Sequence, residues 1–429
     1  MALTTARDGA ATRMTRAALQ RRTLRVLVGA QVLAALGGSG AAAGALLALD
    51  ITGSESLASL PLALLVVGSS ATVMPISALS RRAGRRTGLT VALVTAAFGA
   101  AGVVLAGVLD SFVLLCAASA VFGSGNTAVM LARYAAADLS TPLERGRAIG
   151  RVVFAATFGG VAGPNLLGPA GDVATSIGLS QLTGLFLFSA VAFALAALVQ
   201  FALLRPDPLQ FATALEREGA PEIAAPRVPL RRLLAPSAAV TGLATIVTAN
   251  FVMVAVMAMA PVHMEGQGHS LELVGLVVSL HVLGMFAPSP VTGWLTDRFG
   301  PLTVASGGAA VLVAAGVLAG ASGGNAGAFA AGLTMLGVGW NAGLIAGSTL
   351  LASAVPLAQR PRVEGAGELS MGVAAASATA VAGPVVGIAG YATLAIAGAV
   401  AAAALGPFLL AVVRRGVPAQ VAPANRLLG

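Results

Sequence analysis

Long stretches of this chain contain almost no charged residues, and this limits the folds available to it. Residues of the set AVILMFWYC fill 57% of the 429 positions, and charged residues fill only 10%. A soluble domain has about a quarter charged residues, and a disordered chain has low hydrophobicity. The mean hydropathy of +0.91 therefore excludes both classes and indicates a protein that crosses a membrane several times.

Twelve apolar stretches are long enough to span a bilayer, which requires about 20 residues per helix. The predicted all-α membrane protein thus has twelve transmembrane helices. The stretches cover approximately 26–49, 57–80, 88–109, 112–136, 147–171, 181–204, 236–263, 271–294, 302–322, 326–352, 365–389 and 391–413.

The basic residues give the orientation. All 25 are arginines, and they fall in the two tails and the even-numbered connections. The odd-numbered connections contain only acidic and neutral residues, such as Asp50, Asp110 and Glu265. Because basic loops stay in the cytoplasm, both termini are expected there, in a bacterial inner (plasma) membrane. The net charge of +9 then reflects topology, so no nucleic-acid partner is predicted, and the lipid bilayer is the expected surroundings.

The two halves of the sequence resemble each other. The connection SALSRRAGRR, from Ser77, corresponds to GWLTDRFGPL, from Gly293, and a proline-containing polar segment separates the halves. Two six-helix bundles joined by a cytoplasmic linker fit this repeat. The predicted parts are a tail over 1–25, a bundle over 26–204, the linker over 205–235, a second bundle over 236–413 and a tail over 414–429.

The second of these connections resembles a known signature. Gly293, Asp297, Arg298 and Gly300 match the GxxxDRxG loop of the major facilitator superfamily of secondary transporters. This resemblance covers essentially the whole chain and implies two pseudo-symmetric six-helix bundles that transport by alternating access. The first copy departs from the signature, since Ser77 replaces its glycine and an arginine its aspartate.

Potential soft metal ligands gather in the predicted helices 7 and 8. All three histidines and five of the eleven methionines lie between residues 253 and 285. Met253 and Met257 are four residues apart, as are His281 and Met285, so each pair shares one helical face. Counting about 1.5 Å per residue places Met253 and His281 near the bilayer midplane. The two helices are expected to be antiparallel neighbours, so these side chains converge on one ion if the two faces meet.

Thioether and imidazole ligands without nearby carboxylates favour a soft ion, above all Cu(I). Methionine also fills gaps between apolar helices, so packing is the alternative for the methionines. A histidine at mid-membrane is a functional candidate by default. The motifs MxxxM on helix 7 and HxxxM on helix 8 resemble those of the CcoA-type copper importers, whose signature implies Met253, Met257, His281 and Met285 as metal ligands.

That resemblance implies copper import for cytochrome oxidase assembly, with copper as substrate, no cofactor and a cytosolic copper chaperone as a possible partner. His263, Met264 and His269, near the periplasmic end of helix 7, are candidates for capturing the ion. The alternative for them is an interfacial position with ordinary lipid contacts. No acidic residue is expected at the midplane, and Glu144 and Glu364 are expected to pair with arginines at the cytoplasmic gate.

Two other functions stay open from sequence. Gly163-Pro164 resembles the helix-5 motif of antiporters and favours a proton-coupled efflux transporter for small hydrophobic compounds, although only 4% of residues are aromatic. The alternative for this pair is a helix bend where two helices approach. The other function is that of a membrane receptor that binds copper without transporting it. No nucleophile and base spacing or phosphate-binding loop is present, so an enzyme is not predicted. Cys116 is the single cysteine, which rules out an internal disulfide.

Overall fold

A computed structural model describes residues 2–217, 228–235 and 237–414. Every regular element among these residues is a helix, and their bounds in chain order are as follows. They are α1 (Ala2–Gly37), η1 (Gly38–Ala43), α2 (Gly44–Thr52), α3 (Glu55–Ala58), α4 (Leu60–Val108), α5 (Phe112–Phe122), α6 (Ser124–Ala135), α7 (Arg145–Asn165), α8 (Leu167–Ser176), η2 (Gln181–Thr183), α9 (Gly184–Leu203), α10 (Pro208–Arg217), α11 (Leu230–Leu233), α12 (Ser237–Ala258), α13 (Ala260–Gly266), α14 (Leu271–Phe286), α15 (Ser289–Phe299), α16 (Pro301–Gly320), α17 (Ala326–Ala354), η3 (Leu357–Gln359) and α18 (Arg360–Arg414).

Helices α4 and α18 are each too long for one membrane crossing. The 49 residues of α4 would extend about 74 Å, more than twice the thickness of a bilayer core. Gly84 interrupts α4 with φ 89° and ψ 165°, and Gly390 interrupts α18 with φ 79° and ψ 166°. A Cβ added at Gly88 would overlap the hydroxyl of Ser80, eight residues away. Such proximity requires the chain to reverse at Gly84, so α4 contains two spans.

Nine helical segments in the described part of the chain are long and apolar enough to cross a membrane. Two of these are the broken helices α4 and α18, each of which contains two spans. Consecutive helices α7 and α8 supply one further crossing. The architecture therefore agrees with the twelve spans predicted from sequence.

The predicted tails and linker differ from the helix bounds. Helix α1 starts at Ala2, so most of the predicted 1–25 tail continues the first span as a helix. In the predicted linker, α10 and α11 are helical, and residues 218–227, including Glu218, lie outside the described residues. All but the first residue of the predicted tail over 414–429 also lies outside them.

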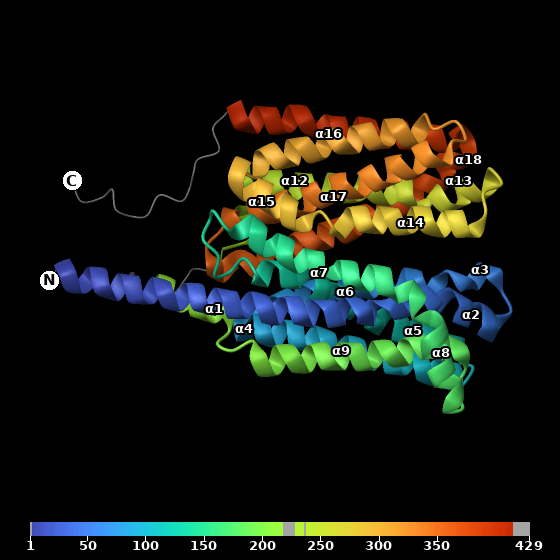
Figure 1. The fold of residues 1–429 in the computed structure, drawn as a ribbon, viewed down its shortest axis with the longest axis horizontal. Helices are drawn as coiled ribbons and strands as arrows, with labels where there is room; N and C mark the ends of the chain where they lie inside the picture. The colour runs from blue at the N-terminus through green and yellow to red at the C-terminus, as the bar shows by residue number, and fades with distance from the viewer. Residues whose placement is uncertain (1, 218–227, 236, 415–429) are drawn as a thin grey trace.

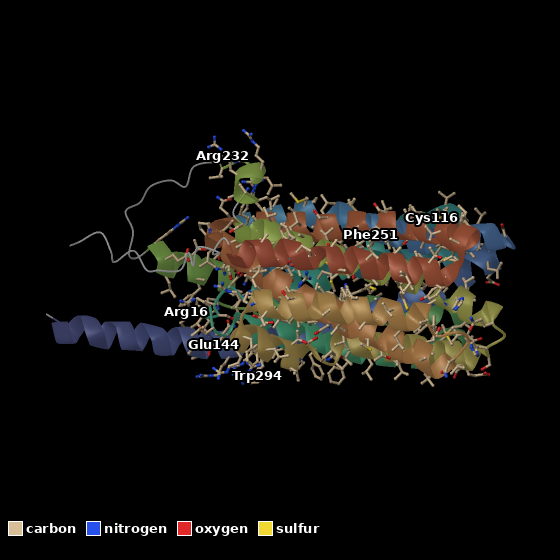
Figure 2. All side chains as sticks on the ribbon, turned by 90° about the horizontal axis from the view of Figure 1, so that it is seen from above. Arg16, Cys116, Glu144, Arg232, Phe251 and Trp294 are labelled. Atoms are coloured by element: carbon tan, nitrogen blue, oxygen red, sulfur yellow. The ribbon has the colours of Figure 1, made fainter. Side chains whose placement is uncertain are left out.

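The helices form two groups that lie side by side. Figure 1 shows α1 to α9 in one group and α12 to α18 in the other, with the start of α1 and the end of α18 toward the same end of the bundle. Across the boundary, α7 packs against α14 and α15, and α4 packs against α18. Arg16, Glu144 and Arg232 lie at one end of the molecule and Cys116 lies at the opposite end (Figure 2). We call the first of these the arginine-rich end.

Small residues allow the helix backbones to approach closely. An added Cβ at Gly68 in α4 would overlap the carbonyl of Ala120 in α5, and one at Gly316 would lie 2.6 Å from the carbonyl oxygen of Ala395. In a lipid solvent no hydrophobic force drives helices together, so close van der Waals packing supplies the attraction instead. Glycines at such contacts, among them Gly68 and Gly316, serve this packing.

Candidate functional site

A cavity of about 280 Å³ lies between the two groups of helices. Helices α4 and α6 line it from one group, and α12, α14, α17 and α18 line it from the other. We call it the central cavity. Its lining residues are Val66, Ser69, Ser70, Val73, Asn126, Thr127, Met130, Asn250, Val254, Met285, Phe286, Trp340, Glu368, Met371, Gly372 and Ala375.

The C-terminal wall of this cavity is a rigid polar and aromatic surface. The Trp340 indole Nε1 donates to Asn250 Oδ1 at 3.0 Å, and Asn250 Nδ2 donates to the Met371 carbonyl at 2.9 Å. Phe286 packs edge-on against Trp340, with ring centroids 5.8 Å apart. Because buried polar groups need partners, these bonds fix the indole and the amide in place. The wall thus presents two ordered aromatic rings.

Asn126 on α6 supplies a free polar group on the opposite wall. Its Nδ2 donates to Ser69 Oγ at 3.0 Å, and no residue in the described chain bonds its Oδ1. The side chain is exposed although its helix lies inside the bundle. Asn126, Met130 and Phe286 also line a second cavity of about 360 Å³. The amide oxygen is therefore a hydrogen-bond acceptor where the two cavities meet.

A buried ion pair between the two groups of helices reaches the central cavity. Arg133 on α6 bonds Glu368 on α18, and the Tyr134 hydroxyl donates to the same carboxylate oxygen at 3.3 Å. Arg133 Nε also donates to Ser348 Oγ at 3.0 Å. Glu368 lines the cavity, so the expectation that no acid lies near the centre is wrong. Helix α18 extends inward from its first residue, Arg360, and two turns later it carries Glu368 to the cavity.

A second ionic layer closes the molecule toward the arginine-rich end. Arg85 Nε donates to Asp138 at 2.8 Å, and its Nη2 donates to Glu364 at 2.6 Å. All three side chains are fully buried, and the layer joins α4 to α18. Glu364 therefore pairs with an arginine as predicted. Glu144 does not, because it is exposed and accepts a hydrogen bond from Thr141.

The predicted DRxG loop takes part in the same closure. The carboxylate of Asp297, at the end of α15, accepts hydrogen bonds from the backbone N–H groups of Gly146 at 2.7 Å and Arg147 at 2.9 Å. These are free donors in the first turn of α7, where the helix dipole favours an anion. Gly300, three residues after Asp297, has φ 87° and ψ 150° and turns the chain into α16.

The predicted metal ligands fall into two places. His281 is buried on α14, and its Nδ1 lies 2.7 Å from the carbonyl oxygen of Leu333 on α17. This leaves Nε2 as the ring nitrogen without a partner among the described residues. Met253 is buried on α12, Met257 is half-buried and Met285 lines the central cavity.

Helix α17 separates the two predicted pairs of ligands. It packs extensively against both α12 and α14, whereas α14 otherwise packs against α7. The expectation that helices 7 and 8 are direct neighbours is therefore wrong, because sequence order does not fix spatial order in a bundle. Within the described residues, no group of three or more His, Cys, Asp or Glu side chains is placed to hold a metal ion.

The residues predicted to capture metal lie at the end opposite the arginines. His263 stacks on Tyr391 with ring centroids 4.4 Å apart, and Phe329 lies 5.4 Å away. Its Nε2 is 3.1 Å from Gln267 Nε2. Met264 is buried on α13. His269 is half-buried and lies in the connection from α13 to α14. Aromatic packing thus accounts for the position of His263.

The sequence carries a signal for the ionic pair. Arg133 lies inside an apolar stretch, although an arginine within a membrane is costly and marks function. The pattern of basic connections predicts it in a cytoplasmic connection, whereas the structure buries it against Glu368. The cavity-lining Asn126 and Asn250 also lie inside predicted apolar stretches, and both form bonds between helices. The side chain of a third, Asn165, lies outside the description.

Comparisons with known proteins agree with the fold. The Major Facilitator Superfamily model matches residues 27–275 and 243–427. The uncharacterized MFS-type transporter YddS of Bacillus subtilis (strain 168) is 37% identical over 310 residues, covering 70% of both chains. The riboflavin transporter RfnT of Brucella anthropi is 32% identical over 314 residues, covering 71% of this chain and 74% of that one.

A solved structure gives the same architecture. The proton:xylose symporter XylE bound to 6-bromo-6-deoxy-D-glucose superposes with a TM-score of 0.74, covering 93% of this chain and 96% of its own. At 15% sequence identity the likeness concerns the fold alone. Neither of the two relatives is described as a copper importer.

Proposed function

Because the chain belongs to the major facilitator superfamily and is a secondary transporter, we propose that its substrate is a small heteroaromatic solute of the flavin type. The solute binds in the central cavity and crosses the membrane by alternating access. Its ring lies against Trp340 and Phe286, and its polar edge meets the Asn126 amide. The single observation that carries this proposal is a cavity with ordered aromatic rings on one wall and an unpaired amide oxygen on the other.

The size and chemistry of the cavity support this substrate class. Sites for small organic molecules are mostly apolar, with a few placed polar groups, and occupy about 300–1,000 Å³. The central cavity of about 280 Å³ meets a neighbouring cavity of about 360 Å³ at Asn126. A ring system in one and a polar chain in the other would use both spaces. The relative RfnT, a riboflavin transporter, is consistent with such a solute.

Glu368 is the proposed coupling group. It is bound to Arg133 across the boundary between the helix groups and also lines the cavity. A proton on this carboxylate removes its charge and so weakens the contact that joins α6 to α18. Because the carboxylate faces the solute, proton binding and solute binding act on the same bridge. We therefore assign proton coupling to Glu368.

The binding claim is tested by tryptophan fluorescence. The chain has two tryptophans, so Trp294→Phe leaves Trp340 as the only reporter. Riboflavin bound beside Trp340 is expected to quench its emission with saturation. Asn126→Ala in this background removes one hydrogen bond and should weaken the apparent affinity about fivefold. Gln267→Ala, an exposed amide at the periplasmic end, is the control and should leave affinity unchanged. Quenching that never saturates, or that Asn126→Ala leaves unaltered, contradicts the proposal.

Copper import for cytochrome oxidase assembly is the second candidate, and one observation favours it. The Nε2 of His281 is buried and has no partner among the described residues, while its Nδ1 is held by a carbonyl, which is the arrangement of a metal-ligating histidine. Met285 is one helical turn away on α14 and lines the cavity. Met253 and Met257 would join such a site only across α17. Loss of copper uptake in His281→Ala would support this candidate.

A further inference from the structure

At the arginine-rich end, a third cavity, polar and of about 400 Å³, lies between the two groups of helices. Arg16 and Arg145 line it from one group, and Arg360 and the 353–357 segment line it from the other. The acids Asp138 and Glu216 also face it. We call it the arginine cavity. It is separate from the central cavity, with which it shares no lining residue.

Two of these guanidinium groups are buried without full pairing. Arg145 and Arg360 are 6% and 7% exposed. Among the described residues, Arg145 Nε, Arg360 Nε and Arg360 Nη1 have no hydrogen-bond partner. Within the described part of the chain, Arg145 bonds only the Ser353 hydroxyl, through Nη1. Arg360 Nη1 is 3.9 Å from Asp138, whose carboxylate already accepts two bonds from Arg85. Two residues that line the cavity therefore carry strong donors without an acceptor among the described residues.

The buried charges at this end do not balance. Within the described chain the buried cations are Arg85, Arg133, Arg145 and Arg360, and the buried anions are Asp138, Glu364 and Glu368. Arg85 and Arg133 are fully engaged with these acids, which leaves Arg145 without a carboxylate at ion-pair distance. A buried cation without a counterion is strongly destabilising. Glu216 on α10 faces the same cavity and attracts both arginines, but it is exposed and lies beyond ion-pair distance of either one.

We propose that the arginine cavity binds a tetrahedral oxyanion of the phosphate class, either free phosphate or the headgroup of an anionic phospholipid. Arginine forks bind such oxygens through paired, charge-assisted hydrogen bonds. Arg360 is the first residue of α18, so the positive end of that helix dipole adds to the attraction. Since Arg145 and Arg360 belong to different groups of helices, the anion holds the two groups together at this end.

The binding test uses the purified full chain in phosphatidylcholine nanodiscs. Millimolar inorganic phosphate, compared with chloride at equal ionic strength, should raise the Tm by about 2 °C. Arg145→Gln and Arg360→Gln should each weaken the apparent phosphate affinity about tenfold. Arg217→Gln removes an exposed arginine of α10 that does not line the cavity, and it should change nothing. Glu216→Gln removes a negative charge that faces the cavity and repels an anion, so it should tighten binding. Equal phosphate effects in all variants overturn the proposal.

A second arm separates the two sources of the anion. Nanodiscs with one-third phosphatidylglycerol and no free phosphate are compared with phosphatidylcholine discs. A phosphate response only in phosphatidylcholine discs, together with a higher starting Tm in the mixed discs, assigns the site to a lipid headgroup. A response of equal size in both discs assigns it to free phosphate. No stabilisation by either source overturns the proposal.

The bridging role has its own readout. Ser77 on α4 is buried against Gly365 of α18, so a thiol there reacts only when the groups separate at this end. In a Cys116→Ser background, Ser77→Cys should react with N-ethylmaleimide several-fold more slowly when phosphate is bound. Arg145→Gln should abolish this protection. An unchanged reaction rate at saturating phosphate overturns the bridging role.

Discussion

At the scale of single residues, the ion pair of Arg133 and Glu368 is the most informative contact. Removing one partner of a buried pair typically costs 3–5 kcal/mol, because the other charge is left unpaired. Here the second partner also lines the central cavity. The pair therefore links the stability of the closed arrangement to the state of the binding site.

Glu368→Gln is predicted to uncouple solute movement from protons while keeping a hydrogen-bonding group beside Arg133. Accumulation of solute driven by an inward proton gradient should fall about tenfold, and exchange of solute without a gradient should continue. Accumulation is expected to fall because glutamine cannot take up a proton, so the variant cannot respond to acid on the outer side of the membrane. Uptake measured at pH 6 and pH 8 checks this, with the exposed Glu144→Gln as control. A variant that retains the full pH response assigns coupling elsewhere.

Part of the site was readable from sequence at this scale. Met285, Asn126 and Asn250 were recognisable as polar or soft groups inside apolar stretches, and all three line the cavity. The partner of each group was not readable, because a pair such as Trp340 and Asn250 is 90 positions apart and depends on helix packing. The metal site on Met253, Met257, His281 and Met285 stays a prediction.

At the scale of helices, glycines set where spans end. Gly84 and Gly300 occupy equivalent positions of the repeated loop and have nearly the same backbone angles, with φ 89° and 87°. The repeat therefore preserves a turn although the first copy has lost the aspartate. Sequence located these turns well because a charged loop between apolar stretches is a strong signal. The sequence did not predict the order of the helices in space, where α17 separates α12 from α14.

Gly300→Ala is predicted to lower the free energy of unfolding by about 1–3 kcal/mol, because only glycine adopts its backbone angles without strain. No atom lies within 4 Å of an added Cβ at this site, so the cost comes from the backbone alone. Gly275→Ala is the matched control, since it too has open space but lies within helix α14. It should be neutral or slightly stabilising. Thermal unfolding in detergent compares the two, and equal Tm values would contradict the assignment of strain.

At the scale of the whole molecule, the two groups of helices are closed at the arginine-rich end. Three separate layers of contacts join them. In the first, Asp297 of α15 accepts hydrogen bonds from the first turn of α7. The second is Arg85 with Asp138 and Glu364, and the third is Arg133 with Glu368. Alternating access requires these layers to open together while the solute stays at the boundary. The twelve spans and their repeat were predictable from hydropathy, but this closed arrangement depends on side-chain pairs across the boundary.

The most direct test of the central claim is solute flux into proteoliposomes containing the purified chain. Riboflavin and copper are supplied in parallel to the wild-type chain, Asn126→Ala and His281→Ala at matched protein amounts. The central cavity as a flavin-type site predicts that the wild-type chain takes up riboflavin, that Asn126→Ala lowers uptake at subsaturating riboflavin about fivefold, and that His281→Ala retains it. Copper uptake that His281→Ala abolishes, with no riboflavin uptake by any chain, would contradict this account and support the copper importer.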